Sequence, residues 1–169
     1  MDDATRELVR DWLTRAAHDL DAARALADVG ERLLDTAIYH CQQAAEKAIK
    51  AWLQSRDEPF PKTHDLEDLV SQAAKLDPAF GQQVKAAAFL TPYVSAFRYP
   101  GGSFEPMPSR EEFDEALTHA RSIFDFVLNL LPPEARPCNS SRSPCSASNT
   151  RWRCSRPTKL PPTAKRRWT

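Results

Sequence analysis

Apolar residues recur every three or four positions through the first part of the chain, which is the period of a helix that buries one face. The first such stripe runs from Leu8 through Trp12 and Ala16 to Ala27, and it predicts a helix over about residues 4–28. Gly30 follows directly, and we expect it to end this helix because glycine adopts the backbone conformations that close helices.

A second helix is predicted from about Leu33 to Gln54. Its apolar face repeats at the same spacing and contains Ile38, Cys41, Ala45, Ala48, Ile49 and Trp52. The small alanine side chains would let a partner helix approach closely. We expect Trp12 and Trp52, which both lie on apolar stripes, to be core aromatic residues.

Two prolines indicate a loop over residues 55–63, after which Thr63 is expected to cap a third helix that ends near Leu76. A fourth helix is predicted from about Pro78, and it should end or kink near Thr91 because Pro92 follows.

A loop composition returns before the last predicted helix, which begins at Ser109. Ser109 and Glu112 have the spacing of a capping box, and the apolar period continues to Leu131. With no strand pattern and short connections, residues 1–131 are predicted to form an all-α, up-and-down bundle of four to five helices.

Residues 132–169 differ from residues 1–131, the body of the chain, in proline content, hydrophobic pattern and charge. They hold seven of the 14 prolines and show no hydrophobic period, so we expect a disordered C-terminal tail rich in Pro, Ser and Arg. The body has 14 Lys and Arg against 22 Asp and Glu, a net charge of −8, whereas the tail has nine against one, a net charge of +8. Such a tail could contact nucleic acid, or it could be an incidental solvated segment.

Several classes of protein are disfavoured by what the sequence lacks. It contains neither a long apolar run nor a signal-peptide pattern, so we expect a cytoplasmic protein that does not contact a membrane. Cys41 is expected to be a small core residue, and His18 and His119 have no partners at metal-ligand spacing. We therefore predict no metal and no cofactor.

The most informative polar residues lie on the second predicted helix. Gln43, Glu46, Lys47 and Lys50 are spaced i, i+3, i+4 and i+7, so they share one helix face. Their ammonium groups suit a phosphate, and the amide can both donate to and accept from a base edge. The same spacing is also typical of a solvated face with helix-stabilising pairs.

Two further positions are candidates for function. His64 opens the third helix and could be a base, a phosphate contact or a structural hydrogen-bonding residue. Arg98 precedes Tyr99 and Pro100 after the fourth helix. Its guanidinium could recognise a phosphate or carboxylate, or it could tie its loop to an acidic residue such as Glu46.

Taken together, these residues resemble the HEPN domain family, specifically its bacterial and archaeal members. The resemblance covers about residues 5–131. It is carried by Trp12-Leu13, Ala17, Asp19-Leu20, Ala22, Tyr39-His40, the Gln42–Ala51 block, Thr63-His64-Asp65-Leu66, Leu69, Leu90-Thr91, Tyr93 and Arg98-Tyr99-Pro100.

The resemblance implies a helical bundle that often forms a homodimer. Many such proteins act with a minimal nucleotidyltransferase, sometimes as a toxin–antitoxin pair, and a nucleotide-binding role is proposed for the family. By this resemblance the ligand-binding residues would be Gln43, Glu46, Lys47, Lys50, His64, Arg98 and Tyr99.

Other HEPN branches are metal-independent ribonucleases that carry an Arg, four to six residues, and then a His. Here seven residues separate Arg10 from His18 and Arg32 from His40, and eight separate Arg110 from His119. The usual acid–base pair is therefore missing, which favours a non-catalytic protein and leaves RNA binding without support from a motif.

Three hypotheses follow, and the first is preferred. It is a nucleotide-binding or accessory module acting with a nucleotidyltransferase. The second is a metal-independent ribonuclease toxin in which His64 and Arg98 converge to form a non-standard catalytic site. The third is a structural module whose polar face only organises a dimer.

Overall fold

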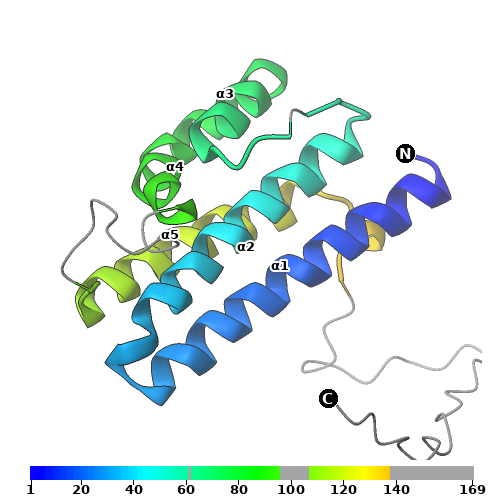
Figure 1. The fold of residues 1–169 in the computed structure, drawn as a ribbon. Helices are drawn as coiled ribbons and strands as arrows, with labels where there is room; N and C mark the ends of the chain where they lie inside the picture. Colours follow the sequence, from blue (N-terminus) through cyan, green and yellow to red (C-terminus); the bar gives the residue numbers. More distant parts are fainter. Residues whose placement is uncertain (61, 96–106, 138–169) are drawn as a thin grey trace, which may run out of the picture. The chain divides into compact units, whose positions relative to one another are not determined.

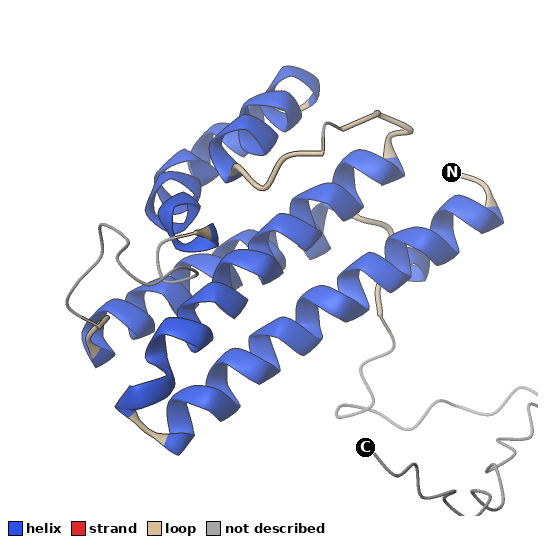
Figure 2. Cartoon of the chain, in the orientation of Figure 1, coloured by secondary structure: helices blue, strands red, loops and turns tan. Residues whose placement is uncertain are grey.

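The computed structural model describes residues 1–60, 62–95 and 107–137. Within these ranges the chain forms five α-helices joined by short 3-10 turns and loops, and it contains no strand (Figures 1 and 2). The predicted all-α, up-and-down bundle is therefore confirmed for these residues. Arg98, Tyr99 and the tail from residue 138 onward lie outside them.

Helices α1 (Asp3–Val29) and α2 (Leu34–Ser55) form a long antiparallel hairpin along one side of the bundle (Figure 1). The Asp2 carboxylate caps α1 by accepting a hydrogen bond from the Thr5 amide at 2.7 Å. At the other end Gly30 has a φ of 137°, a conformation that residues with a side chain rarely adopt. Gly30 thus ends α1 as the sequence predicts.

The buried stripe of α1 is rotated by one position from the predicted one. Val9 and Leu13 lie in the core, whereas Leu8 is 44% exposed and Trp12 is only partly buried. The two stripes merge at Ala16, which belongs to both. The expectation that Trp12 is a core residue is therefore wrong, and its indole lies at the surface junction of α1 and α2.

Helix α2 is the central element and packs against α1, α3 (Leu66–Leu76) and α5 (Arg110–Leu130). Trp52 is buried near its end, as predicted, with its ring centroid 4.5 Å from that of Phe80. Phe80 in turn makes an edge contact with Phe126 at 4.9 Å. This aromatic cluster joins α2 to α5 and to the 3-10 turn at Pro78–Gln83.

The end of α2 is a Schellman motif. The Glu58 amide donates to the Leu53 carbonyl and the Asp57 amide donates to the Gln54 carbonyl, both at 3.1 Å. Asp57 occupies the left-handed position with a φ of 55°. This motif turns the chain back along α2 and so starts the loop that leads to the next helix.

Helix α3 (Leu66–Leu76) ends where the sequence predicts but is capped by a different residue. The Asp65 carboxylate accepts hydrogen bonds from the amides of Glu67 and Asp68, at 2.8 and 3.2 Å. Thr63, the predicted cap, instead accepts a bond from the Asp65 amide. A carboxylate at the positive end of a helix is a strong cap, and this explains why the helix begins two residues later.

The predicted fourth helix is divided into three parts. It begins as a 3-10 turn, η2 (Pro78–Gln83), continues as α4 (Val84–Leu90), and ends as a second 3-10 turn, η3 (Thr91–Val94). The change at Thr91 agrees with the break expected before Pro92. In Figure 1, α3 and α4 lie together on the side of α2 that faces away from α1.

Helix α5 (Arg110–Leu130) is capped by Ser109, whose hydroxyl accepts from the Glu112 amide at 3.2 Å, as expected. The Glu112 carboxylate does not complete a capping box with Ser109 but accepts a hydrogen bond from the Tyr93 hydroxyl. A final turn, η4 (Pro133–Ala135), packs on α1, where Arg10 donates to the Glu134 carbonyl. The described structure therefore continues past Leu131.

Among the described residues, no helix has both the length and the apolar content to cross a lipid bilayer. The same residues contain no group of three His, Cys, Asp or Glu side chains arranged to hold a metal ion. Cys41 is a free, buried thiol, and burial raises its pKa to about 12. It is therefore a core residue, as expected, and not a reactive thiolate.

Candidate functional site

A strip of polar side chains runs along α2 where that helix faces the loop leading to α3. We call it the polar strip, and it consists of Gln42, Gln43, Glu46, Lys47 and Lys50. Gln42, Glu46 and Lys50 follow one another at steps of four residues and are almost fully buried, with exposures of 0, 4 and 7%. Gln43 and Lys47 form a parallel, half-buried row beside them.

The Glu46 carboxylate is the centre of the buried row. It accepts a hydrogen bond from Lys50 Nζ at 2.8 Å and from Gln42 Nε2 at 3.2 Å, and His64 Nδ1 lies 3.2 Å from both of its oxygens. A buried carboxylate requires several such partners to offset the loss of water. The ion pair with Lys50 leaves this buried cluster without an unpaired charge.

The same buried row holds the loop in front of it. Lys50 Nζ donates to the Thr63 carbonyl and Gln42 Nε2 donates to the His64 carbonyl, each at 2.9 Å. Two side chains of α2 thus bind two successive main-chain carbonyls. The loop is fixed to the helix at the point where His64 enters the site.

His64 combines a fixed ring edge with an exposed one. Its side chain is 63% exposed although Nδ1 contacts the buried Glu46 carboxylate. Because a carboxylate only accepts hydrogen bonds, we assign the proton of the neutral imidazole to Nδ1. The Nε2 lone pair is then available as a hydrogen-bond acceptor or a base.

A second carboxylate hub lies where α1 meets α2. Asp19 of α1 accepts a hydrogen bond from Lys47, and His40 Nδ1 lies 2.9 Å from its other oxygen. The two hubs are chemically alike, since each carboxylate binds one lysine and one histidine Nδ1. Gln43 connects them: it donates to Gln42 Oε1 at 2.8 Å and accepts from Lys47 at 3.4 Å.

The network leaves three polar groups accessible to a ligand. His64 is largely exposed, and the side chains of His40 and Lys47 are partly exposed. The ammonium can bind an anion such as phosphate, and each imidazole presents an Nε2 that accepts a hydrogen bond when the ring is neutral and donates one when the ring is protonated. The buried residues behind them hold these groups in place.

Five of the predicted site residues are brought together in one place, namely Gln43, Glu46, Lys47, Lys50 and His64. The reading of their helix face as solvated is wrong for Glu46 and Lys50, because the loop before α3 covers them. Direct contact of these two residues with a ligand stays a prediction. Arg98 and Tyr99, the other two candidates, lie outside the described residues.

Three residues of the site were not among the sequence candidates. His40 could have been found, because it precedes Gln43 and Lys47 by three and seven residues and so lies on the same helix face. Gln42 is next to Gln43 in the sequence, but nothing in the local pattern indicates that it binds the loop before α3. Asp19 carries no local signal, since only the pairing of α1 with α2 brings it to Lys47.

Comparison with known proteins agrees with this architecture. The family model described as "HEPN domain" matches residues 9–130. The solved structure of TT1696 from Thermus thermophilus is 30% identical, with a TM-score of 0.63 over 73% of this chain and 98% of that one. ST0689, described as an archaeal HEPN homologue, is 28% identical, with a TM-score of 0.59 over 72% and 96% of the two chains. No curated protein matches.

Proposed function

This chain belongs to the HEPN family, and we propose that it is a nucleotide-binding accessory module that acts with a nucleotidyltransferase, as in a toxin–antitoxin type pair. The observation that supports nucleotide binding is the arrangement of the polar strip together with His40, His64 and Asp19 around it. Lys47, His40 and His64 present a cation and two imidazole edges to solvent, while Glu46 and Asp19 hold them from behind.

Rigid placement matters because a ligand need not then order these side chains. Each long side chain that is immobilised on binding costs about 0.5–1.5 kcal/mol. Lys47 and His64 already have fixed partners in the folded protein, so most of this conformational entropy is lost during folding and not during ligand binding. The proposal therefore assigns Glu46 and Lys50 a positioning role and assigns ligand contact to the accessible groups.

Isothermal titration calorimetry with purine nucleotides tests this proposal. We expect saturable heat with the wild-type protein and at least about fivefold weaker binding for His64→Ala and Lys47→Met. His18→Ala and Lys85→Ala are the controls, because both residues are exposed and neither makes a hydrogen bond or ion pair with the polar strip, His40, His64 or Asp19. Absence of heat with every nucleotide, with and without the candidate partner, would contradict nucleotide binding.

The partner is tested separately by co-expression with a minimal nucleotidyltransferase encoded beside this chain. A stable complex on size-exclusion chromatography with light scattering is the expected result. The same measurement on the chain alone gives its oligomeric state, for which we propose a homodimer. A monodisperse dimer that binds neither nucleotide nor the nucleotidyltransferase would favour the purely structural module.

One observation supports a second candidate function, a metal-independent ribonuclease. Glu46 orients the His64 ring so that Nε2 can accept a proton, which is the arrangement of a general base and its orienting carboxylate. Purified protein should then cleave RNA in the presence of EDTA, and His64→Ala should abolish the cleavage. Equal cleavage by the His64→Ala protein would exclude this use of the site.

A further inference from the structure

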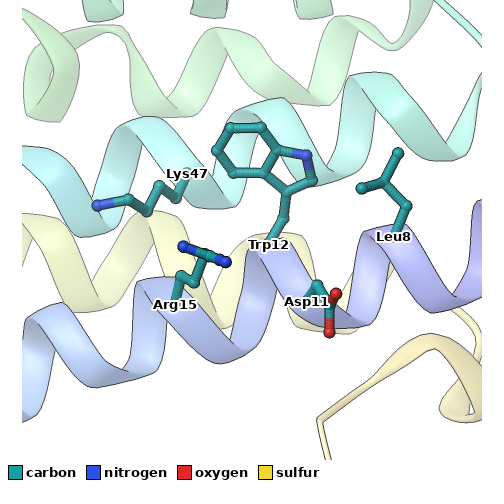
Figure 3. A pocket seen from close by; sticks show the side chains of 5 residues that line it. All are labelled: Leu8, Asp11, Trp12, Arg15 and Lys47. Carbon is teal, nitrogen blue, oxygen red and sulfur yellow. The ribbon is translucent and has the colours of Figure 1, made fainter.

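A surface groove of about 430 Å³ lies beside the polar strip, over the junction of α1 and α2 (Figure 3). It is lined by Leu8, Asp11, Trp12 and Arg15 of α1 and by Lys47 of α2. Its volume falls within the range of about 300–1,000 Å³ that is typical of small-molecule sites. Lys47 belongs to both the groove and the polar strip, so the two features are continuous.

The groove has two chemically different ends. Figure 3 shows the Trp12 indole in the middle, Leu8 on one side of it, and the charged ends of Arg15 and Lys47 on the other. Leu8 and Arg15 are seven residues apart, which is about 10 Å along a helix that rises about 1.5 Å per residue. One end therefore suits a planar apolar ring and the other suits an anionic group.

The two cations at the polar end, Arg15 and Lys47, have hydrogen-bond donors that no other described residue uses. Arg15 is exposed and makes no hydrogen bond or ion pair with any other residue in the described ranges. Lys47 contacts Asp19 and Gln43, which leaves one of its three ammonium donors unused. An anion between Arg15 and Lys47 would therefore gain two charged donors without displacing an existing bond.

The aromatic surface is fixed in position as well. Trp12 packs against Phe60 with ring centroids 6.3 Å apart and planes at 80°. The indole is thereby held at the groove while it remains only partly buried. A held indole is a stacking platform that accepts any nucleobase.

We infer that this groove binds a mononucleotide, with the base on Trp12 and the phosphate between Arg15 and Lys47. The inference rests on the proposed function and adds the position and orientation of the ligand. Asp11 sets the orientation, because its carboxylate would repel a phosphate at the Leu8 end but can accept a hydrogen bond from a ribose hydroxyl or a base N–H.

The charge of the whole body indicates a small ligand and not a polynucleotide. Residues 1–131 have 14 basic and 22 acidic side chains, and this net negative charge opposes the binding of an extended phosphate backbone. The groove itself has two cations and one carboxylate among its lining residues. A single phosphate needs only the two adjacent cations Arg15 and Lys47, whereas a long strand would meet the net negative charge of residues 1–131.

Calorimetric titration of the full chain with AMP, adenosine and ribose 5-phosphate tests the inference. Arg15→Gln should weaken AMP about tenfold and leave adenosine unchanged, whereas Trp12→Leu should weaken AMP and adenosine but not ribose 5-phosphate. Trp12→Phe should retain most of the affinity, because it keeps an aromatic surface. Arg32→Gln is the matched control, since Arg32 is an exposed arginine remote from the groove lining.

The outcomes separate this inference from the proposed function. If the wild-type protein binds AMP and the Arg15→Gln and Trp12→Leu proteins bind it equally well, the groove assignment is overturned while nucleotide binding stands. An equal loss in the Arg32→Gln protein would also overturn it, because the effect would then be one of general charge. If the wild-type protein binds no nucleotide at all, the proposed function and the groove assignment both fail.

Circular dichroism of each variant guards against an effect on folding. Arg15 has no partner among the described residues, so Arg15→Gln should leave the melting temperature unchanged. Trp12→Leu removes the Phe60 contact and should lower it. Ribose 5-phosphate binding then reports whether the phosphate end remains intact in that variant, and its loss together with that of AMP would contradict the assigned orientation.

Discussion

The Nζ atom of Lys50 lies 2.8 Å from Oε1 of Glu46, one turn along the same helix, and both side chains are buried. Ion pairs at this spacing are usually exposed and contribute only a few tenths of a kcal/mol. Here the loop before α3 removes the pair from water. Each buried charge is therefore compensated only by its partner, and the bond from Lys50 to the loop requires that the pair stays intact.

Removing one member of this pair should be costly. Glu46→Gln leaves a buried ammonium without a counter-charge, and we expect it to lower the free energy of unfolding by about 3 kcal/mol. The double variant Glu46→Gln, Lys50→Met should recover more than half of that loss because no buried charge remains. Urea denaturation followed by circular dichroism measures both values. A loss below about 0.5 kcal/mol for Glu46→Gln would show that the pair is solvated.

The cap of α3 can be tested by comparing two neighbouring residues. Asp65→Ala removes the acceptor for the Glu67 and Asp68 amides, and we expect it to cost about 1 kcal/mol. Thr63→Ala should cost less, because the Thr63 hydroxyl accepts only the Asp65 amide and the substitution keeps the carbonyl that Lys50 binds. Thermal unfolding of the two variants gives the order. A larger loss of stability for Thr63→Ala than for Asp65→Ala would indicate that Thr63 is the main N-cap of α3, as the sequence predicted.

The end of α2 offers a stabilising substitution. Asp57 has a φ of 55°, which costs a residue with a side chain more than it costs glycine. Asp57→Gly should therefore raise the free energy of unfolding by about 0.5 kcal/mol, whereas Asp57→Ala should lower it. Parallel urea titrations decide between these directions. A loss of stability for Asp57→Gly would mean that the carboxylate contributes more than the backbone conformation costs.

Cys41 should make the fold sensitive to alkali. Burial raises the pKa of its thiol from 9.0 to about 12, so the unfolded chain releases this proton at a lower pH than the folded chain does. The contribution is complete below pH 9 and is lost as the pH rises toward 12. Between pH 8 and 10 the loss is roughly 1.4 kcal/mol.

The measurement compares urea denaturation of the wild-type and Cys41→Ala proteins at several pH values. Burial and the hydrogen bond to Glu112 also raise the pKa of Tyr93, but Tyr93 contributes equally to both proteins. Only the wild-type curve should carry the additional decline above pH 9. Parallel pH curves for the two proteins would contradict the raised pKa of Cys41.

Helix positions were largely predictable because they depend on local rules. Periodicity located α1, α2 and α5, and Ser109 had the residue type and spacing of an N-cap. The start of the buried stripe of α1 was predicted wrongly, because Val9 and Leu13 have the same four-residue spacing as Leu8 and Trp12. Val9 is buried and Leu8 exposed only as a result of tertiary packing in the bundle.

The sequence identified five residues of the candidate site but not their burial, and it did not identify the residues that come from other elements. The spacing of Glu46 and Lys50 does not distinguish an exposed pair from a buried one, because both lie on the same helix face in either case. Burial arises when residues 62–65 cross that face, which is a tertiary event. The second hub required Asp19 from another helix, so no pattern within α2 could have indicated it.

The two bonds from α2 to the loop end on the carbonyls of Thr63 and His64, not on their side chains. Every amino acid supplies such a carbonyl. Residue 64 can therefore be exchanged without removing the bonds that set the path of the loop. The side chain at position 64 can thus change while the path of the loop stays the same. Relatives that keep Gln42 and Lys50 could therefore bind different ligands with the same loop conformation.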